Sequence, residues 1–172
     1  MILRDAEGGR TVELRPTGYD ADDRVLVEAT VEDAGHRWEL AEPCLRADEA
    51  DELAGWLDGL ATGAPAAAQG GVEIAADEYT AAAAPARETD GGAPGDTTDD
   101  GGWSSLAFSG GVLSLSGRRT GDDRVELRIA ILGMRTSATG TTDVVVGLDL
   151  AADEARAAAR DLALELAALP RG

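Results

Sequence analysis

The chain has 172 residues, of which 44% are hydrophobic, and a formal net charge of −18. This length suits one domain, or two small halves that share a core. The negative charge repels nucleic acids and anionic membranes and favours a basic partner. An acidic surface also keeps a protein soluble in a salt-adapted cell, and the absence of Lys among the 15 basic residues fits that second interpretation. Composition therefore leaves a basic partner and salt adaptation as alternatives.

The single cysteine, Cys44, excludes an intramolecular disulfide. Disulfides are the usual stabiliser of small secreted domains, so their absence favours a reducing compartment. Residues 1–10 include Asp5 and two early glycines, which is unlike a secretory signal peptide. The longest apolar runs, such as residues 144–150, are too short to cross a bilayer. These features predict a cytoplasmic protein.

The N-terminal part has the pattern of β-strands. Residues 12–15 alternate apolar and charged side chains, and residues 25–31 are rich in β-branched residues. A turn signal at residues 32–35 leads into a second alternating run at residues 36–40. We expect an antiparallel hairpin with one buried face, to which the second run contributes His36, Trp38 and Leu40.

Residues 47–62 change to the spacing of an amphipathic helix. Asp48 is the predicted N-cap, with Asp51 at the third helical position, where acids suit the helix dipole. Gly63 and Pro65 are predicted to end the helix. The apolar stripe of this helix is formed by Leu53, Trp56, Leu57 and Leu60.

The middle of the chain has little to bury. Residues 72–75 are predicted to form a short strand, but residues 77–102 lose all periodicity and carry seven acids against one Arg. Such a segment has the composition of a flexible acidic insertion. Because a loop this long is uncommon inside a compact domain, we expect it to join two halves.

Strands return after this insertion, and a helix ends the chain. Glycine turns at residues 110–111 and 121–122 separate the strands. The last helix is expected from about Asp153 to Leu169, with Pro170 as its stop. The predicted strands are residues 106–108, 112–116, 124–131 and 143–150, and the apolar stripe of the helix is Ala155, Ala158, Ala159, Leu162, Leu166 and Leu169.

These elements predict an α+β fold with an antiparallel β-sheet and two amphipathic helices, in the order strands, helix, strands, helix. We expect one domain over residues 1–172, with halves 1–76 and 103–172 joined by the acidic insertion. Asp-Asp-Arg-Val occurs at residues 22 and 122, and Ala-Asp-Glu-Ala at residues 47 and 152. These matches indicate either an internal duplication or convergent composition.

The sequence offers no strong catalytic or metal motif. His36 and Cys44 are the minimum for thiol catalysis, yet a cysteine in a Glu-Pro-Cys corner is more typical of a packed core. Zinc would require about four His, Cys or carboxylate ligands. The oxygen-rich run at residues 96–101 lacks the ligand pattern of a calcium loop. Pairs of carboxylates are expected by chance in a chain this rich in acids, so they do not indicate acid–base catalysis. We therefore expect a protein that is not an enzyme and needs no cofactor.

The acids around the first helix form the best-defined surface feature of the sequence. A solvated helix face is the ordinary explanation for such acids, and a binding face for a basic partner is the functional one. The residues that we expect to contact such a partner are Glu42, Asp48, Asp51, Glu52 and Asp58.

Four consecutive segments carry a pattern of strand, glycine turn, Trp-containing strand, acid-Pro-Cys-Leu corner and Trp-Leu helix. They are residues 25–31, 35–40, 42–45 and 53–57, and over residues 20–60 the pattern resembles the WapI-type immunity-protein family. The C-terminal part is similar in outline over residues 124–171, with a Val-rich strand and a terminal Ala/Leu helix.

The resemblance implies a function in protein binding. Members with an assigned function protect the producing cell from a polymorphic toxin, so the resemblance implies a non-catalytic protein that binds a toxin stoichiometrically. An acidic inhibitor would be steered toward a basic toxin by long-range electrostatics. The alternative, left open by the residues themselves, is an acidic, salt-adapted domain with a housekeeping or regulatory role.

Overall fold

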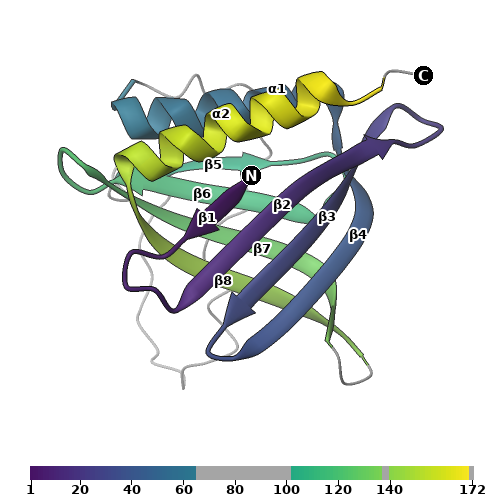
Figure 1. Ribbon diagram of the computed structural model, residues 1–172, viewed down its shortest axis with the longest axis horizontal. Helices are drawn as coiled ribbons and strands as arrows, with labels where there is room; N and C mark the ends of the chain where they lie inside the picture. The colour runs from purple at the N-terminus through teal and green to yellow at the C-terminus, as the bar shows by residue number, and fades with distance from the viewer. Residues whose placement is uncertain (65–101, 137–139, 171–172) are drawn as a thin grey trace, which may run out of the picture.

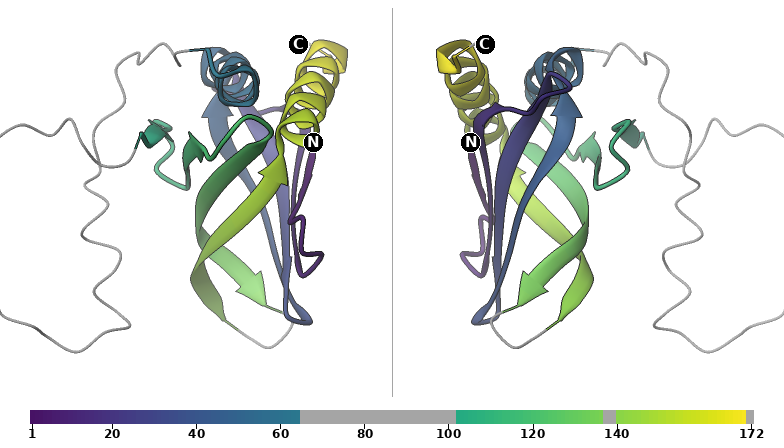
Figure 2. Two further views of the ribbon diagram at one scale, coloured as in Figure 1. Left: turned by 90° about the vertical axis from the view of Figure 1, so that its left-hand side faces the viewer. Right: turned by 90° about the vertical axis from the view of Figure 1, so that its right-hand side faces the viewer.

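The computed structural model describes residues 1–64, 102–136 and 140–170, which form a curled antiparallel sheet of eight strands with two helices at one end (Figures 1 and 2). The sheet has the shape of a half-barrel, and the helices cover its upper opening in the view of Figure 1. The elements are β1 (Ile2–Arg4), β2 (Arg10–Tyr19), β3 (Arg24–Asp33), β4 (His36–Arg46), α1 (Ala47–Thr62), β5 (Ser104–Ala107), β6 (Leu113–Arg119), β7 (Arg124–Thr136), β8 (Thr141–Ala151) and α2 (Ala152–Ala168).

The strands form two antiparallel groups, β1 to β4 and β5 to β8, which meet through β7. The sheet order is β1-β2-β3-β4-β7-β6-β5, and β8 pairs with β7. Among the described residues, β4 pairs with β7 at two positions, Trp38 with Thr136 and Glu39 with Arg135. The 13-residue β7 reaches β4 after a register shift between Ile131 and Met134. Such a bulge bends a strand, so it lets β7 curl across to the first group.

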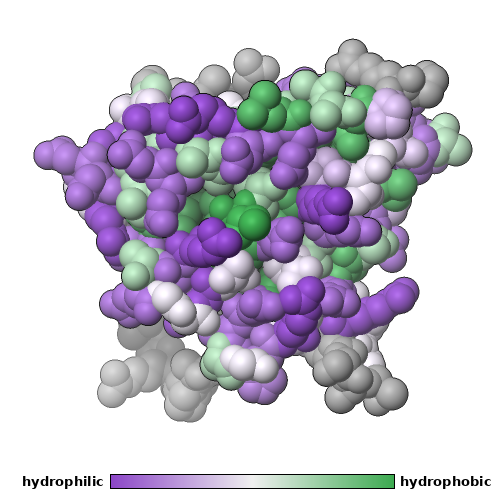
Figure 3. Space-filling model, viewed as in Figure 1, coloured by the Kyte–Doolittle hydropathy of each residue, from purple (hydrophilic) through white to green (hydrophobic). Residues whose placement is uncertain are grey.

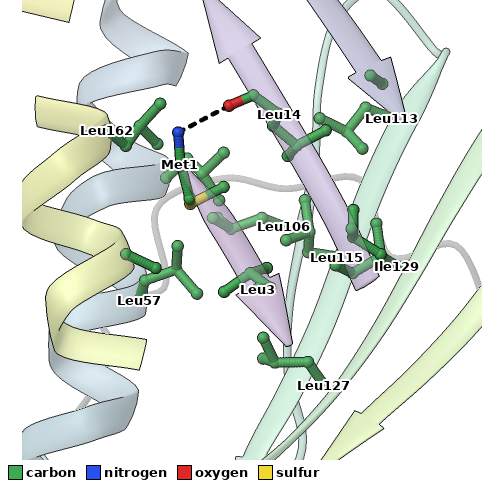
Figure 4. Packing of buried hydrophobic residues seen from close by; sticks show 14 of the residues in the cluster. Met1, Leu3, Leu14, Leu57, Leu106, Leu113, Leu115, Leu127, Ile129 and Leu162 are labelled. Carbon is green, nitrogen blue, oxygen red and sulfur yellow. Dashed lines mark hydrogen bonds between the residues drawn. The ribbon is translucent and has the colours of Figure 1, made fainter. Parts of the chain in front are cut away.

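Alternating apolar side chains build the core on the inner face of the sheet. Along β7, Val125, Leu127, Ile129 and Ile131 are all buried, because every second side chain of a strand points to the same face. Figure 4 shows leucines of the sheet meeting Leu57 of α1 and Leu162 of α2. The same close-up shows Met1, whose terminal amine donates to the Leu14 carbonyl 3.0 Å away.

The two helices pack on this core through the predicted stripes. In α1 the side chains of Leu53, Trp56, Leu57 and Leu60 are buried, as expected. In α2 the buried residues are mostly small, and small side chains allow close approach to neighbours. α1 ends at Gly63, whose φ of 70° is the left-handed conformation that glycine adopts readily. The stripes of both helices are therefore confirmed, except that Leu169 is only partly buried.

The start of α1 differs from the sequence prediction. The N-cap of α1 is Arg46 rather than Asp48, and Glu49 occupies the third helical position. The Glu49 carboxylate accepts a hydrogen bond from the Arg46 N–H at 2.8 Å. The Asp48 carboxylate, one residue earlier in the helix, does not accept this hydrogen bond. The short strand β1 was not anticipated. The predicted strand at 72–75, the candidate calcium run at 96–101 and nearly all of the insertion at 77–102 lie outside the described residues.

The α+β class, with its antiparallel sheet and two helices, is confirmed.

Each group of four strands is followed by a helix, and some hydrogen bonds occur at equivalent places in the two groups. The Asp20 N–H donates to the Arg24 carbonyl at 2.9 Å, and the Thr120 N–H donates to the Arg124 carbonyl at 3.0 Å. Glu154 caps α2 from its third position as Glu49 caps α1. The division into halves 1–76 and 103–172 stays a prediction.

Candidate partner-binding surface

The register of the β3–β4 hairpin places a second acidic turn beside the start of α1. The hairpin turns through Ala34 and Gly35, whose φ values of 49° and 81° suit a tight two-residue turn. After a register shift between Val25 and Leu26, Arg24 at the start of β3 pairs with Arg46 at the end of β4. The residues before Arg24 therefore lie next to the first turn of α1.

An open depression of about 460 Å³ lies at this junction. Its carboxylates come from two separate segments, because Asp22 and Asp23 belong to the turn before β3 and Asp48 belongs to α1. Arg24 and Arg46 line the same depression. Asp22 and Asp23 were not among the expected contact residues. Their position could have been predicted from the hairpin, because a turn at residues 34–35 brings the start of β3 next to the end of β4.

Three of the expected residues lie on exposed positions of α1. Asp51 and Asp58 are seven residues apart, so they lie on the same side of the helix roughly 10 Å from each other. Asp48 pairs with Arg46 at 3.0 Å, and Asp58 approaches Arg156 of α2 at 4.0 Å. Within the part of the chain that the structure describes, Asp51 has no ion pair. We call Asp22, Asp23, Asp48, Asp51 and Asp58 the acidic surface.

Glu52 and Glu42 are arranged differently from the other three. The Glu52 side chain is only half-exposed, and its Oε1 atom is buried without a hydrogen-bond partner among the described residues. Glu42 is exposed, but it lies on β4 opposite Val27 rather than on the helix. The structure thus gathers Asp48, Asp51 and Asp58 on one helix and sets Glu42 apart from them.

His36 and Cys44 do not form a catalytic pair. They lie at opposite ends of β4, roughly 26 Å apart for eight residues of extended strand. Cys44 is 2% exposed, and burial, with a smaller contribution from the charge of Glu42, raises the pKa of its thiol to about 11. His36 is exposed and stacks on Trp38, with 5.7 Å between the ring centroids. The two side chains are therefore too far apart to act as a catalytic pair.

Among residues 1–64, 102–136 and 140–170, no three His, Cys, Asp or Glu side chains are grouped so that they could hold a metal ion. Over the same residues, no helix is both long and apolar enough to span a membrane.

Trp103 makes cation–π contacts with two arginines. The guanidinium carbons of Arg118 and Arg128 lie 4.9 and 4.4 Å from its ring centroid.

The curled sheet and the pair of covering helices define an α+β protein. The chain belongs to the immunity protein WapI-like family, whose model matches residues 1–170. This match confirms the resemblance seen in residues 20–60 and extends it over nearly the whole chain. Neither a curated protein nor a solved structure gave a match.

Proposed function

We propose that this chain is an immunity protein that neutralises a basic polymorphic toxin by binding it stoichiometrically, without catalysis, in the cytoplasm of the producing cell. The family supports an immunity role. The observation that supports a basic partner is the acidic surface, in which five carboxylates outnumber the three neighbouring arginines, Arg24, Arg46 and Arg156. The α1 sequence itself contains five acids and no basic residue.

The electrostatics of this surface suit rapid association. A net charge of −18 gives a long-range field that attracts a basic protein, and exposed carboxylates on a rigid helix can direct the final approach. Asp51 contributes most directly, because its charge is exposed and is not neutralised by a neighbouring Arg in the described structure. Asp48 and Asp58 would exchange their weak exposed ion pairs for contacts with the partner.

The proposal is tested first by identifying the partner. Tagged protein is incubated with a lysate of the native organism at low and at high salt, and retained proteins are identified by mass spectrometry. We expect one basic protein in a one-to-one ratio, retained at low salt and released at high salt. The captured protein is then purified, and its toxic activity is measured with and without the chain. A captured protein whose activity is unaffected by stoichiometric binding would overturn the immunity assignment.

The acidic surface is tested with a pair of charge-matched variants. Asp51→Arg reverses a charge on α1, and Glu28→Arg makes the same change at an exposed position of β3. We expect Asp51→Arg to weaken toxin binding about tenfold, mainly through slower association, and to flatten its salt dependence. Glu28→Arg should have a much smaller effect. Equal effects of the two variants would show that net charge, and not this surface, carries the attraction.

The salt-adaptation alternative has its own signature. If acidity served only solubility, folding would depend strongly on ionic strength and no specific partner would be retained at either salt concentration. A denaturation series across salt concentrations therefore accompanies the capture experiment.

A further inference from the structure

The outer edge of β1 is joined to β8 just beyond its C-terminal end, where the Ala6 N–H donates to the Asp149 carbonyl, but Ile2 and Arg4 pair with no further strand among the described residues. The Met1 amine donates to the Leu14 carbonyl and the Leu14 N–H donates to the Met1 carbonyl, each at 3.0 Å. The Asp5 N–H donates to the Arg10 carbonyl, also at 3.0 Å. Odd-numbered residues of this segment thus face β2. In an antiparallel ladder the residues between them point their N–H and C=O groups to the opposite side, so Ile2 and Arg4 present theirs away from β2.

A groove follows this edge, between β1 and α2. It has a volume of about 250 Å³, and Ile2, Arg4, Ala157 and Ala158 form part of its lining. Ile2 is 40% exposed, although it is a large hydrophobic residue. Figure 1 shows β1 below α2 at the front of the molecule, and Figure 3 shows hydrophobic atoms exposed among hydrophilic ones on the same face. The groove therefore combines an open strand edge with apolar surface.

The α2 wall of the groove is acidic. Glu154, Asp161 and Glu165 line it. The Glu165 carboxylate is paired with the Met1 amine at 2.9 Å, and Glu154 accepts the Ala151 N–H at 3.3 Å. Asp161 is exposed and has no ion pair among the described residues. A segment with basic side chains would therefore find both hydrogen-bonding partners and opposite charge in this groove.

The corresponding edge strand of the second group is hydrogen-bonded to a helix. β5 is the other terminal strand of the sheet order, and it is fastened to α1. The Trp56 Nε1–H donates to the Ser104 hydroxyl at 2.9 Å, and the Glu49 carboxylate accepts the Ser109 N–H at 2.8 Å.

We propose that the β1–α2 groove binds an extended basic segment of a partner protein, which adds to β1 as a further strand. Strand addition uses the main-chain groups of Ile2 and Arg4 for affinity, while the acidic α2 wall selects basic side chains. A second copy of this chain is disfavoured as the occupant, because each copy carries a net charge of −18. The proposal does not depend on the immunity function, since the groove is separate from the acidic surface of α1.

The test uses the whole protein and three synthetic peptides. The first peptide alternates Arg and Val, so that its Arg side chains fall on one side of an extended strand. The second has the same sequence with alternate main-chain amides methylated, which removes the donors that would face β1. The third replaces Arg with Glu. We expect only the first peptide to bind, and we expect the amide protons of Ile2 and Arg4 to shift in NMR spectra and to exchange more slowly with solvent.

A charge-matched pair of variants locates the site. Asp161→Arg should weaken binding of the Arg-Val peptide about fivefold through loss of attraction to the groove. Glu28→Arg, which reverses a charge at an exposed position of β3, should leave peptide binding nearly unchanged. Equal binding of the methylated peptide would overturn strand addition, and equal effects of the two variants would overturn the groove as the site. Since no toxin is used, failure here leaves the immunity proposal standing, and failure of toxin capture leaves this one standing.

Discussion

The carboxylate of Asp5 accepts a hydrogen bond from the main-chain N–H of Asp149 at 2.8 Å. The next residue, Ala6, donates its own N–H to the Asp149 carbonyl at the same distance. A side chain and a main-chain group together connect the N-terminal segment to β8. Arg124 completes this connection, because its Nε–H donates to the Asp149 carboxylate at 2.9 Å. This seam closes the side of the half-barrel where β1 and β8 do not pair as regular strands.

Asp5→Ala is expected to lower the free energy of unfolding by roughly 1–2 kcal/mol, because it leaves the partly buried Asp149 N–H without its acceptor. Urea denaturation followed by circular dichroism measures the change. Asp5→Asn is the matched control, since the amide oxygen can still accept the hydrogen bond. It should lose clearly less stability than Asp5→Ala. Equal losses would show that the charge of Asp5, and not its acceptor oxygen, stabilises the seam.

The backbone of the loop before β6 lies very close to the backbone of β4 at Gly110. A Cβ atom added at Gly110 would lie 2.7 Å from the Cys44 carbonyl oxygen. A backbone carbonyl cannot move aside as the end of a flexible side chain can. Gly110→Ala should therefore destabilise the fold by about 1–3 kcal/mol through overpacking. Gly147→Ala on β8, where the added Cβ meets nothing within 4 Å, is the control and should be nearly neutral. Comparable denaturation midpoints for the two variants would contradict this explanation.

The helices and the longer strands could be predicted because their periodicity is strong and uninterrupted. Leu53 and Leu57 repeat at helical spacing, and residues 25–31 alternate along β3. The strand β1 was missed because three residues are too few to show a period. Its place in the sheet comes from pairing with Arg10–Tyr19, which is a tertiary effect. The joining of the two strand groups through the end of β7 likewise depends on a bulge that local patterns do not reveal.

The candidate surface was predictable only in part. Asp48, Asp51 and Asp58 share one helix, so their helical spacing placed them together. Asp22 and Asp23 come from a distant turn and join them only through the hairpin register. The burial of the Glu52 Oε1 atom cannot be predicted from helical spacing either, because it depends on which residues pack beside α1.

The capping role assigned to Glu49 predicts a contrast with Asp48. The Glu49 carboxylate accepts N–H groups from Arg46 and from Ser109, each at 2.8 Å, so it holds the start of α1 and the loop after β5 together. Glu49→Ala should cost about 1–2 kcal/mol of unfolding free energy. Asp48→Ala removes only an exposed ion pair with Arg46 and should cost less than about 1 kcal/mol. Thermal or urea denaturation of both variants decides the matter, and the reverse order of losses would restore Asp48 as the cap.

The buried thiol of Cys44 predicts slow chemistry in the native state. Because burial raises its pKa to about 11, almost no thiolate exists at neutral pH. We expect a thiol reagent such as iodoacetamide to label the native protein very slowly, and to label it readily after unfolding in denaturant. The rate of labelling can be followed by mass spectrometry. Rapid labelling of the folded protein at neutral pH would show that Cys44 is both accessible and activated.

The same pKa predicts how stability changes in alkali. Below the unfolded-state pKa, about 8.5 for a free thiol, both states keep the proton and Cys44 adds no pH dependence. Between that value and about 11 the unfolded state releases the proton while the folded state retains it. Stability should therefore fall as pH rises, by up to ~1.4 kcal/mol per pH unit from this group. Cys44→Ala, although less stable overall, should lack this component, so the free energies of unfolding of the two proteins should converge between pH 9 and 11. Parallel curves would mean that the thiol ionises equally easily in both states.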